Sequence, residues 1–218
     1  FYRFKKHDDG KYIYTKDRGW FFEKNLIENL NCFEGKRILD YKLPEYHSDI
    51  PMMIFSPSVV NDGRRLLISP QKITFLCNTD TSLFSGKIAL ENIEFSTLFN
   101  KNDPQYLKIS SAMRMNATFP YILPMVFLPS EPKIEVMDAG LRDNLGLTTS
   151  IKYIDNFKNW IHEHTSGVVI IQLRDREKKT KIKDKQSGSL ISKLFTPLTN
   201  IYGNFLKIQD YRNDEMLN

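Results

Sequence analysis

Glycine, cysteine and long apolar runs are scarce in this chain of 218 residues, and each scarcity excludes a class of protein. The ten glycines include no adjacent pair and no Gly-x-Ser-x-Gly element, so the chain has neither a phosphate-cradling loop nor a nucleophile elbow. Cys32 and Cys77 are too few for a disulfide framework and lack metal-ligand spacing. No stretch approaches the ~20 apolar residues that a membrane-spanning helix needs.

Histidine is also rare, which limits the catalytic chemistry that the chain can carry by itself. The four histidines are His7, His47, His162 and His164. None of them follows a predicted strand, where a catalytic base would be presented. His162 and His164 lie two residues apart, so they cannot share one helical face as a metal-binding pair would. We therefore predict neither a histidine base nor a metal site.

The composition is that of a soluble globular protein, with 41% hydrophobic and 26% charged residues and a net charge of +5. Basic residues are concentrated in 176–185, and residues 190–206 keep an apolar helical spacing that Pro197 interrupts. A solvated loop and a helix packed on the core are the simplest interpretation of these two segments. Contact with an anionic membrane surface is the alternative. No aromatic residues interleave the charges, so a nucleic-acid partner is not predicted.

Apolar spacing predicts several helices, and short apolar or β-branched runs predict strands. The predicted helices are Trp20–Leu30, Phe95–Leu98, Pro104–Asn116 and Leu145–Ile161. The predicted strands are Pro51–Val60, Leu66–Ile68, Ile73–Cys77, Lys133–Met137 and Val168–Leu173. Asn61-Asp62-Gly63 predicts a hairpin turn, which Arg64 and Arg65 follow as solvated side chains.

A strand, a helix and a second strand follow one another between Lys133 and Leu173. This order is typical of a parallel α/β unit. Val168–Leu173 is continuously apolar, as in a strand that is covered on both faces. We therefore expect Lys133–Met137 to lie beside Val168–Leu173 in one sheet flanked by helices.

The most specific motif is Asp138-Ala139-Gly140, which follows the strand Lys133–Met137 and precedes a helix. Upstream lie Ser110-Ser111-Ala112 and Phe119-Pro120. In this order the motifs resemble those of the patatin-like phospholipases, which carry Ala-Ser-x-Ala, Phe-Pro and then Asp-Gly-Gly or Asp-Gly-Ala. This chain departs from the pattern at Ala139, and at Gly146 it lacks the proline of the family's Asn-x-Pro element.

The resemblance implies a Ser-Asp dyad in which Asp138 is the general base. It places Ala139, Gly140, Asn144, Ser110 and Ser111 around that base, with Asn144 capping the following helix and bracing the aspartate loop. It also places Phe119, Pro120, Tyr121 and Leu123 beside an acyl-binding cleft. An apolar environment would raise the proton affinity of the carboxylate, as a dyad without histidine requires. From the residues alone, Asp138 could instead cap the next helix.

The implied fold class is α/β, the C-terminal portion of a patatin-like three-layer α/β/α hydrolase. The expected organisation is a segment of unclear role at 1–50, the patatin-like part at 51–173, a charged loop at 174–188 and an amphipathic helical extension at 189–218. The implied activity is hydrolysis of the fatty-acyl ester of a lipid or phospholipid. This chemistry requires no metal or organic cofactor.

The chain begins with Phe1 and lacks the serine elbow, so we expect the nucleophile and the oxyanion loop upstream, in a longer parent protein. The fragment alone is then inactive, with an exposed apolar rim where the rest would dock. The alternative is a non-catalytic binding or structural domain of the same fold. An unrelated nucleotide-binding α/β domain is disfavoured by the absent glycine loop. The compartment is not predicted.

Overall fold

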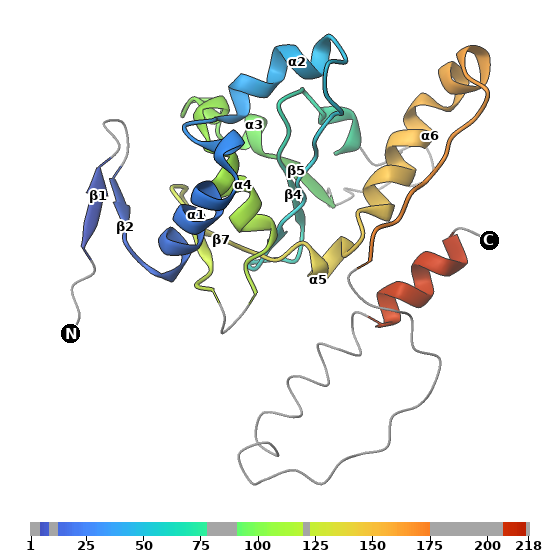
Figure 1. Ribbon diagram of the computed structural model, residues 1–218. Helices are drawn as coiled ribbons and strands as arrows, with labels where there is room; N and C mark the ends of the chain where they lie inside the picture. The colour runs from blue at the N-terminus through green and yellow to red at the C-terminus, as the bar shows by residue number, and fades with distance from the viewer. Residues whose placement is uncertain (1–4, 9–12, 78–90, 120–122, 175–206, 217–218) are drawn as a thin grey trace, which may run out of the picture. The chain divides into compact units, whose positions relative to one another are not determined.

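The computed structural model of the chain describes residues 5–8, 13–77, 91–119, 123–174 and 207–216 (Figure 1). The chain divides into two compact units, Phe1–Arg142 and Asp143–Asn218. The first unit contains a five-stranded mixed sheet, and the second is built mainly from one long helix. A mixed α/β architecture is therefore confirmed.

The sheet of the first unit has the strand order β5-β4-β3-β7-β6. All five strands are short: β3 (Ser58–Val59), β4 (Arg65–Leu67), β5 (Asn92–Glu94), β6 (Val126–Leu128) and β7 (Ile134–Met137). β3 pairs antiparallel with β4 and β7, β6 pairs antiparallel with β7, and β4 runs parallel to β5. A separate antiparallel hairpin joins β1 (Lys6–Asp8) to β2 (Ile13–Thr15).

The described residues form seven helices in addition to short 3₁₀ turns. Those of the first unit are α1 (Arg18–Asn29), α2 (Lys42–Tyr46), α3 (Phe95–Leu98), α4 (Ile109–Asn116) and α5 (Gly140–Asp143), whose last residue belongs to the second unit. The second unit contains α6 (Leu147–His164) and a helix at 207–216. None of these helices is long and apolar enough to cross a membrane.

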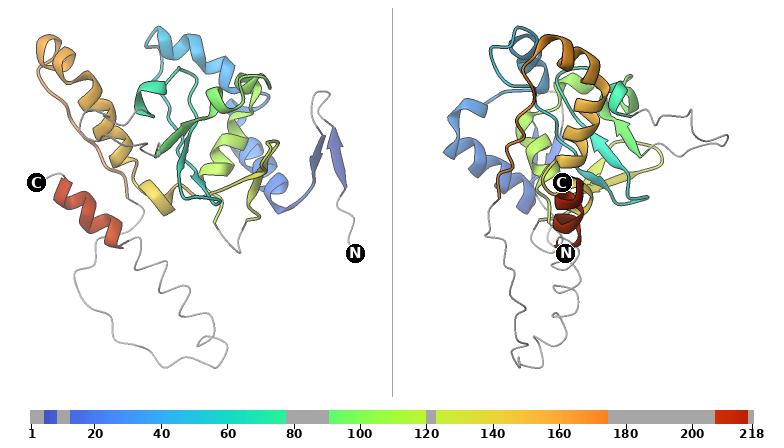
Figure 2. Two further views of the ribbon diagram at one scale, coloured as in Figure 1. Left: turned by 180° about the vertical axis from the view of Figure 1, so that it is seen from behind. Right: turned by 90° about the vertical axis from the view of Figure 1, so that its right-hand side faces the viewer.

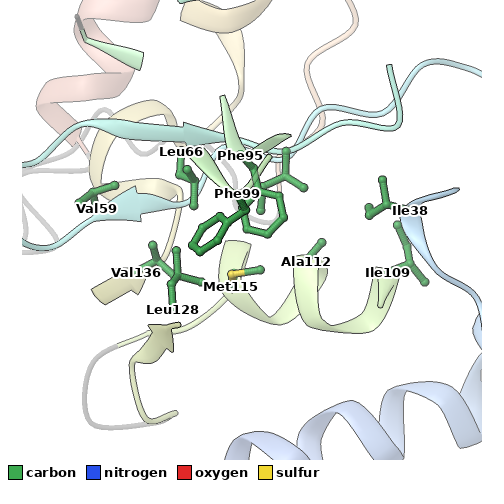
Figure 3. Packing of buried hydrophobic residues seen from close by; sticks show 11 residues of the cluster. Ile38, Val59, Leu66, Phe95, Phe99, Ile109, Ala112, Met115, Leu128 and Val136 are labelled. Atoms are coloured by element: carbon green, nitrogen blue, oxygen red, sulfur yellow. The ribbon is translucent and has the colours of Figure 1, made fainter. Parts of the chain in front are cut away.

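The core of the first unit forms between α4 and the sheet. Met115 of α4 lies beside Val136 of β7, Ile109 lies beside Ile38, and Ala112 lies between them (Figure 3). All five side chains are buried. The spacing of three residues between the α4 positions places them on one face of the helix, which explains why this segment is helical and why it packs here.

The opposite face of α4 is polar and lies against α1. Figure 2 (right) shows α4 between α1 and the strands of the sheet. The hydroxyls of Ser110 and Ser111 donate to Glu23 of α1, over 3.3 and 2.9 Å. α4 is therefore held by apolar packing on one side and by polar contacts on the other.

The helices predicted around residues 20 and 95 and the helix after Asp138 are confirmed. α1 begins slightly earlier than expected because the Asp17 carboxylate accepts the amide of Trp20 over 2.8 Å and caps the helix. The predicted helix at Pro104–Asn116 is divided: Pro104–Tyr106 is a 3₁₀ turn, and α4 starts only at Ile109. Lys108 between them is extended.

The hairpin turn at Asn61-Asp62-Gly63 is confirmed, and it joins β3 to β4. Gly63 has a φ of +74°, a conformation that favours glycine. The prediction for the arginines is only half right. Arg64 is exposed and pairs with Asp62, whereas Arg65 is buried, with a side chain that is 1% exposed. Arg65 can be buried because two partners lie beside its guanidinium group. Asn92 accepts a hydrogen bond from it, and Glu91 carries the opposite charge.

The predicted strand Val168–Leu173 is wrong, and so is its predicted place beside the strand that ends at Asp138. Residues 168–173 form no strand, and Val169, Ile171 and Leu173 are 86%, 79% and 85% exposed. Both edges of β7 are already hydrogen-bonded, to β3 and to β6. A β-branched run indicates strand propensity, but a strand also requires a free edge to pair with.

Two further strand predictions fail in part. Ile73–Cys77 contains a 3₁₀ turn at Thr74–Leu76, whose apolar residues are buried without being paired in the sheet. Within Pro51–Val60 only β3 is a strand, with an isolated bridge from Phe55 to Ile68. β5 and β6 were not predicted, because Asn92 and Glu94 are polar and β6 is only three residues long.

Some expectations lie outside the described residues. They are the charged segment 176–185 and the helical spacing over 190–206. In the second unit the helix at 207–216 is described, and Arg174 pairs with Asp210 over 3.5 Å and with Asp214 over 3.8 Å.

A buried carboxylate at the end of β5 generates a testable prediction. Glu94 accepts the amide of Ile73 and the hydroxyls of Thr74 and Thr97, over 2.9, 2.6 and 2.9 Å. Burial raises the pKa of Glu94, but these hydrogen bonds outweigh it and the pKa is lowered overall. We expect Glu94→Gln to lower the free energy of unfolding at pH 7 by about 1–3 kcal/mol, because the neutral amide cannot accept all three bonds.

The pH dependence of the same variant checks the cause. A carboxyl whose pKa is lowered by folding stabilises the protein above its unfolded pKa of about 4.3 and loses that contribution as the pH falls further. The stability difference between the wild type and Glu94→Gln should therefore shrink in urea unfolding below about pH 4. Exposed Glu163→Gln is the control. A Glu94→Gln protein as stable as the wild type at pH 7 would contradict the assignment.

Candidate active site

Asp138 directly follows β7, which is buried at Val136 and paired on both edges. Its backbone amide donates to the carbonyl of Thr118 over 2.9 Å, and the next amide, of Ala139, donates to Asn116 over 3.1 Å. These bonds join the Asp138 turn to the C-terminal end of α4. The structure thus brings the aspartate motif together with the segment that precedes Phe119-Pro120.

The carboxylate of Asp138 has one constrained oxygen. Oδ1 accepts the amide of Gly140 over 2.6 Å, a bond to the residue two positions on that is typical of an Asx turn, at the start of α5. Oδ2 has no hydrogen-bond partner within the part of the chain that the structure describes. One oxygen therefore orients the side chain, while the other keeps its lone pairs available for a proton.

The environment of Asp138 favours its protonated form. Burial raises the pKa of Asp138, and the hydrogen bond from Gly140 only partly opposes that rise. Asp138 itself is half-buried, and the next residue, Ala139, is buried. A carboxylate with raised proton affinity is a better general base at neutral pH than an exposed aspartate.

The residues after Asp138 do not all have the expected roles. The helix cap expected from Asn144 is formed by Asp143 instead, whose carboxylate accepts the amides of Thr148 and Thr149 over 3.0 and 2.9 Å and the Thr149 hydroxyl over 2.8 Å. Asn144 is exposed, and its backbone amide donates to Gln209 over 3.3 Å. Asp143 is the better cap because its carboxylate reaches the first turn of α6 past Gly146, which has a φ of +67°.

Ser110 and Ser111, expected around the base, direct their hydroxyls to Glu23 and not to Asp138. Arg114 completes this α1–α4 contact, because its guanidinium pairs with Glu23 over 3.3 Å and with Asp17 over 3.5 Å. Glu23, Asp17 and Arg114 were missed in the sequence, where no motif marks them. The two serines hold α4 against α1, and so position Asp138 only through the helix.

A cavity formed by described residues lies on this α1–α4 side. It has a volume of about 520 Å³ and is lined by α1, the β1–β2 hairpin and β6, with Trp20 and Phe127 among its apolar residues and Arg114 among its charged ones. Asp138, Phe119 and Leu123 do not line it. Leu123 donates its amide to Phe119 over 3.1 Å, whereas Pro120 and Tyr121 lie outside the described residues. The acyl cleft at Asp138 therefore stays a prediction.

An ion network lies beside the turn that carries Asp138. Glu91 Oε1 is 2.9 Å from Nη2 of Arg142 on α5 and 3.2 Å from Nη2 of the buried Arg65. Arg65 Nε also donates to Asn92 over 2.8 Å, and Asn92 donates to the carbonyl of Leu76 over 2.6 Å. The network therefore links α5 to the parallel strands β4 and β5. No sequence motif marks this network, because its partners are distant along the chain.

The described residues contain no group of three or more histidine, cysteine or acidic side chains that could hold a metal ion. Comparison with protein-family models, with curated proteins and with solved structures finds no match. The geometry around Asp138 and the motifs that resemble those of the patatin-like phospholipases are therefore the basis for a functional proposal.

The raised proton affinity of Asp138 can be measured through stability. An acid whose pKa is raised by folding destabilises the folded state as the pH rises from its unfolded pKa of about 3.9 through the folded pKa. Asp138→Asn keeps an oxygen that can accept the Gly140 amide but removes the charge. We expect the variant to unfold at equal or higher urea concentration at pH 7, and to lose the decline in stability above about pH 4. Equal pH profiles for the two proteins would refute the desolvation.

The α1–α4 contact makes a second prediction. Gly19 of α1 lies so close to Arg114 that an added Cβ would overlap the guanidinium. We expect Gly19→Ala to destabilise the first unit by about 1–3 kcal/mol, because Arg114 must leave both carboxylates. Arg114→Ala should remove most of this penalty in the double variant, which urea unfolding of all four proteins would show. Additive effects would mean that the two residues do not interact.

Proposed function

We propose that this chain supplies the general base, Asp138, of a patatin-like Ser-Asp acyl hydrolase that cleaves fatty-acyl esters of lipids or phospholipids. The nucleophilic serine and the oxyanion donors are absent from these residues, so the parent protein supplies them. The proposed fold is the C-terminal portion of the family's three-layer α/β/α hydrolase domain.

The observation that carries the proposal is that the two oxygens of the Asp138 carboxylate have different environments. Oδ1 is held by the amide of Gly140, and Oδ2 has no partner within the described residues. Burial raises the pKa, as a base that acts without histidine requires. The backbone bonds from Asp138 and Ala139 to Thr118 and Asn116 also support it, because they bring the aspartate motif next to the segment that precedes Phe119-Pro120.

In the proposed reaction Asp138 acts on protons and does not form a covalent bond. Oδ2 accepts the proton of the serine hydroxyl while the serine oxygen attacks the acyl carbonyl carbon. The proton then passes to the oxygen of the departing alcohol, and the acyl-serine remains. Asp138 next accepts a proton from water, whose oxygen attacks the acyl carbon, and returns it to the serine as the fatty acid leaves.

A non-catalytic domain is the second candidate, and one observation favours it. The Gly140 contact is an ordinary turn bond that an aspartate makes with no catalytic role. In such a domain the raised pKa of Asp138 would have no consequence beyond stability. A sequence upstream of Phe1 without a Gly-x-Ser-x-Gly element would decide for this candidate.

We also propose that the enzyme contacts the membrane surface that contains its substrate. The segments 176–185 and 190–206, which lie outside the described residues, combine lysines with an apolar helical spacing. Peripheral contact with anionic lipid through these segments would bring the enzyme to its substrate.

Activity of the parent protein tests the proposal. We expect the parent to hydrolyse a fatty-acyl ester and Asp138→Asn to reduce kcat by at least ~10²-fold, because general-base assistance is typically worth ~10²–10⁴-fold. Asp143→Asn would be a poor control because Asp143 caps α6, so the exposed Asp155→Asn is used instead. The isolated chain should show no turnover.

Two outcomes would overturn the assignment. Unimpaired turnover by a folded Asp138→Asn parent would remove Asp138 from the mechanism. Turnover by the isolated chain would require a nucleophile within these 218 residues, and the dyad would then have to be sought elsewhere.

A further inference from the structure

Besides the backbone bonds to the end of α4, two side-chain contacts hold the turn that carries Asp138. At its start, the Asp138 carboxylate accepts the amide of Gly140, the first residue of α5. At its end, Arg142 pairs with Glu91 over 2.9 Å. α5 has only four residues and cannot hold its own orientation by helical hydrogen bonds alone. The pair of Arg142 and Glu91 therefore adds a direct tie between α5 and the sheet.

Glu91 is a rigid anchor because it is itself held by the sheet. Its backbone carbonyl accepts the amide of Arg65 over 3.0 Å, and its carboxylate lies 3.2 Å from the Arg65 guanidinium. Arg65 is buried, and its Nε donates to Asn92 of the adjacent parallel strand. The Arg65 side chain has no solvent around it to replace these partners, so its position is determined by the network.

A buried arginine is unusual on a strand of a small sheet, such as β4. Desolvation of a guanidinium is costly, and apolar side chains of similar size often stabilise a core equally well or better. Unlike apolar packing, an ion network specifies the direction in which its partners lie. The direction that it specifies here, through Glu91, is that of Arg142 and α5.

We infer that Glu91 and Arg142 are positioning residues for the Asp138 turn, and that the buried Arg65 fixes Glu91 in the place from which it acts. This inference rests on the proposed function only in naming Asp138 as the base. The geometric part, that the ion pair holds the first amide of α5 against the Asp138 carboxylate, stands without it. Neither residue touches the reacting atoms.

The most direct readout is hydrogen exchange at the Gly140 amide in the 218-residue chain. Arg142→Gln removes the outer ion pair but leaves Arg65 and Glu91 together, and the Arg142 side chain is 39% exposed, so the fold should persist. We expect exchange of the Gly140 amide to become about two- to fivefold faster, as suits a partly exposed ion pair. Arg142→Lys, which keeps the charge next to Glu91, should restore part of the protection.

Arg64→Gln is the matched control. Arg64 also pairs with an acidic residue, Asp62, but this partner belongs to the β3–β4 turn and not to the sheet edge that holds α5. Exchange at Gly140 should be the same in this variant as in the wild type. Glu91→Gln is a second probe and should accelerate exchange at least as much as Arg142→Gln, provided that its far-ultraviolet circular dichroism is unchanged.

Kinetics in the parent protein separate positioning from a general loss of structure. Arg142→Gln should lower kcat about two- to fivefold while KM stays within twofold, because the base is misaligned and substrate contacts are unchanged. Partial recovery of kcat in Arg142→Lys is expected. A rise in KM with unchanged kcat would contradict a positioning role.

The two arms distinguish the possible failures. Unchanged Gly140 exchange in Arg142→Gln overturns the inference, whatever the activity of the parent. Faster exchange together with an active Asp138→Asn parent leaves the positioning of the turn in place and overturns the catalytic assignment. Equal acceleration in Arg64→Gln would show a global effect and would also overturn the inference.

Discussion

The packing of α4 between the sheet and α1 is the constraint on which the geometry around Asp138 depends. Ile109, Ala112 and Met115 bury one face of the helix against the strands. Its C-terminal end is thereby placed where the carbonyls of Asn116 and Thr118 accept the amides of Ala139 and Asp138. A shift of α4 would move these acceptors, so the position of the carboxylate follows from apolar packing in the core.

Two carboxyls of the first unit show how hydrogen bonds and burial compete in setting a pKa. Glu94 is surrounded by donors and its pKa is lowered, whereas Asp138 has one donor on one oxygen and its pKa is raised. Burial acts on both carboxyls in the same direction. The number of hydrogen bonds decides the outcome, which is why one carboxylate suits a structural role and the other a chemical one.

The helices were predicted better than the strands, for a physical reason. A helix satisfies its backbone hydrogen bonds locally, so the spacing of Trp20 and Leu26, or of Ile109 and Ala112, is enough to indicate it. A strand needs a partner that the sequence does not name. Val168–Leu173 has strong strand propensity but forms no strand, while the polar β5 pairs because β4 has an edge beside it. Within the site, the position of Asp138 directly after a strand was predicted, whereas its backbone link to the end of α4 was not. The α6 cap by Asp143 and the contact of Ser110 and Ser111 with Glu23 were not.

By itself the sequence determined a mixed α/β chain, the hairpin turn at Gly63 and the location of Asp138 at the end of a strand, because these depend on local patterns of apolar residues and glycine. Only the tertiary structure decided the mainly antiparallel order of the sheet, the burial of Arg65 and the ion pair between Glu91 and Arg142. These features join residues that are far apart in the chain. Their energies depend on burial and on distances between side chains, which are set only when the whole unit has folded.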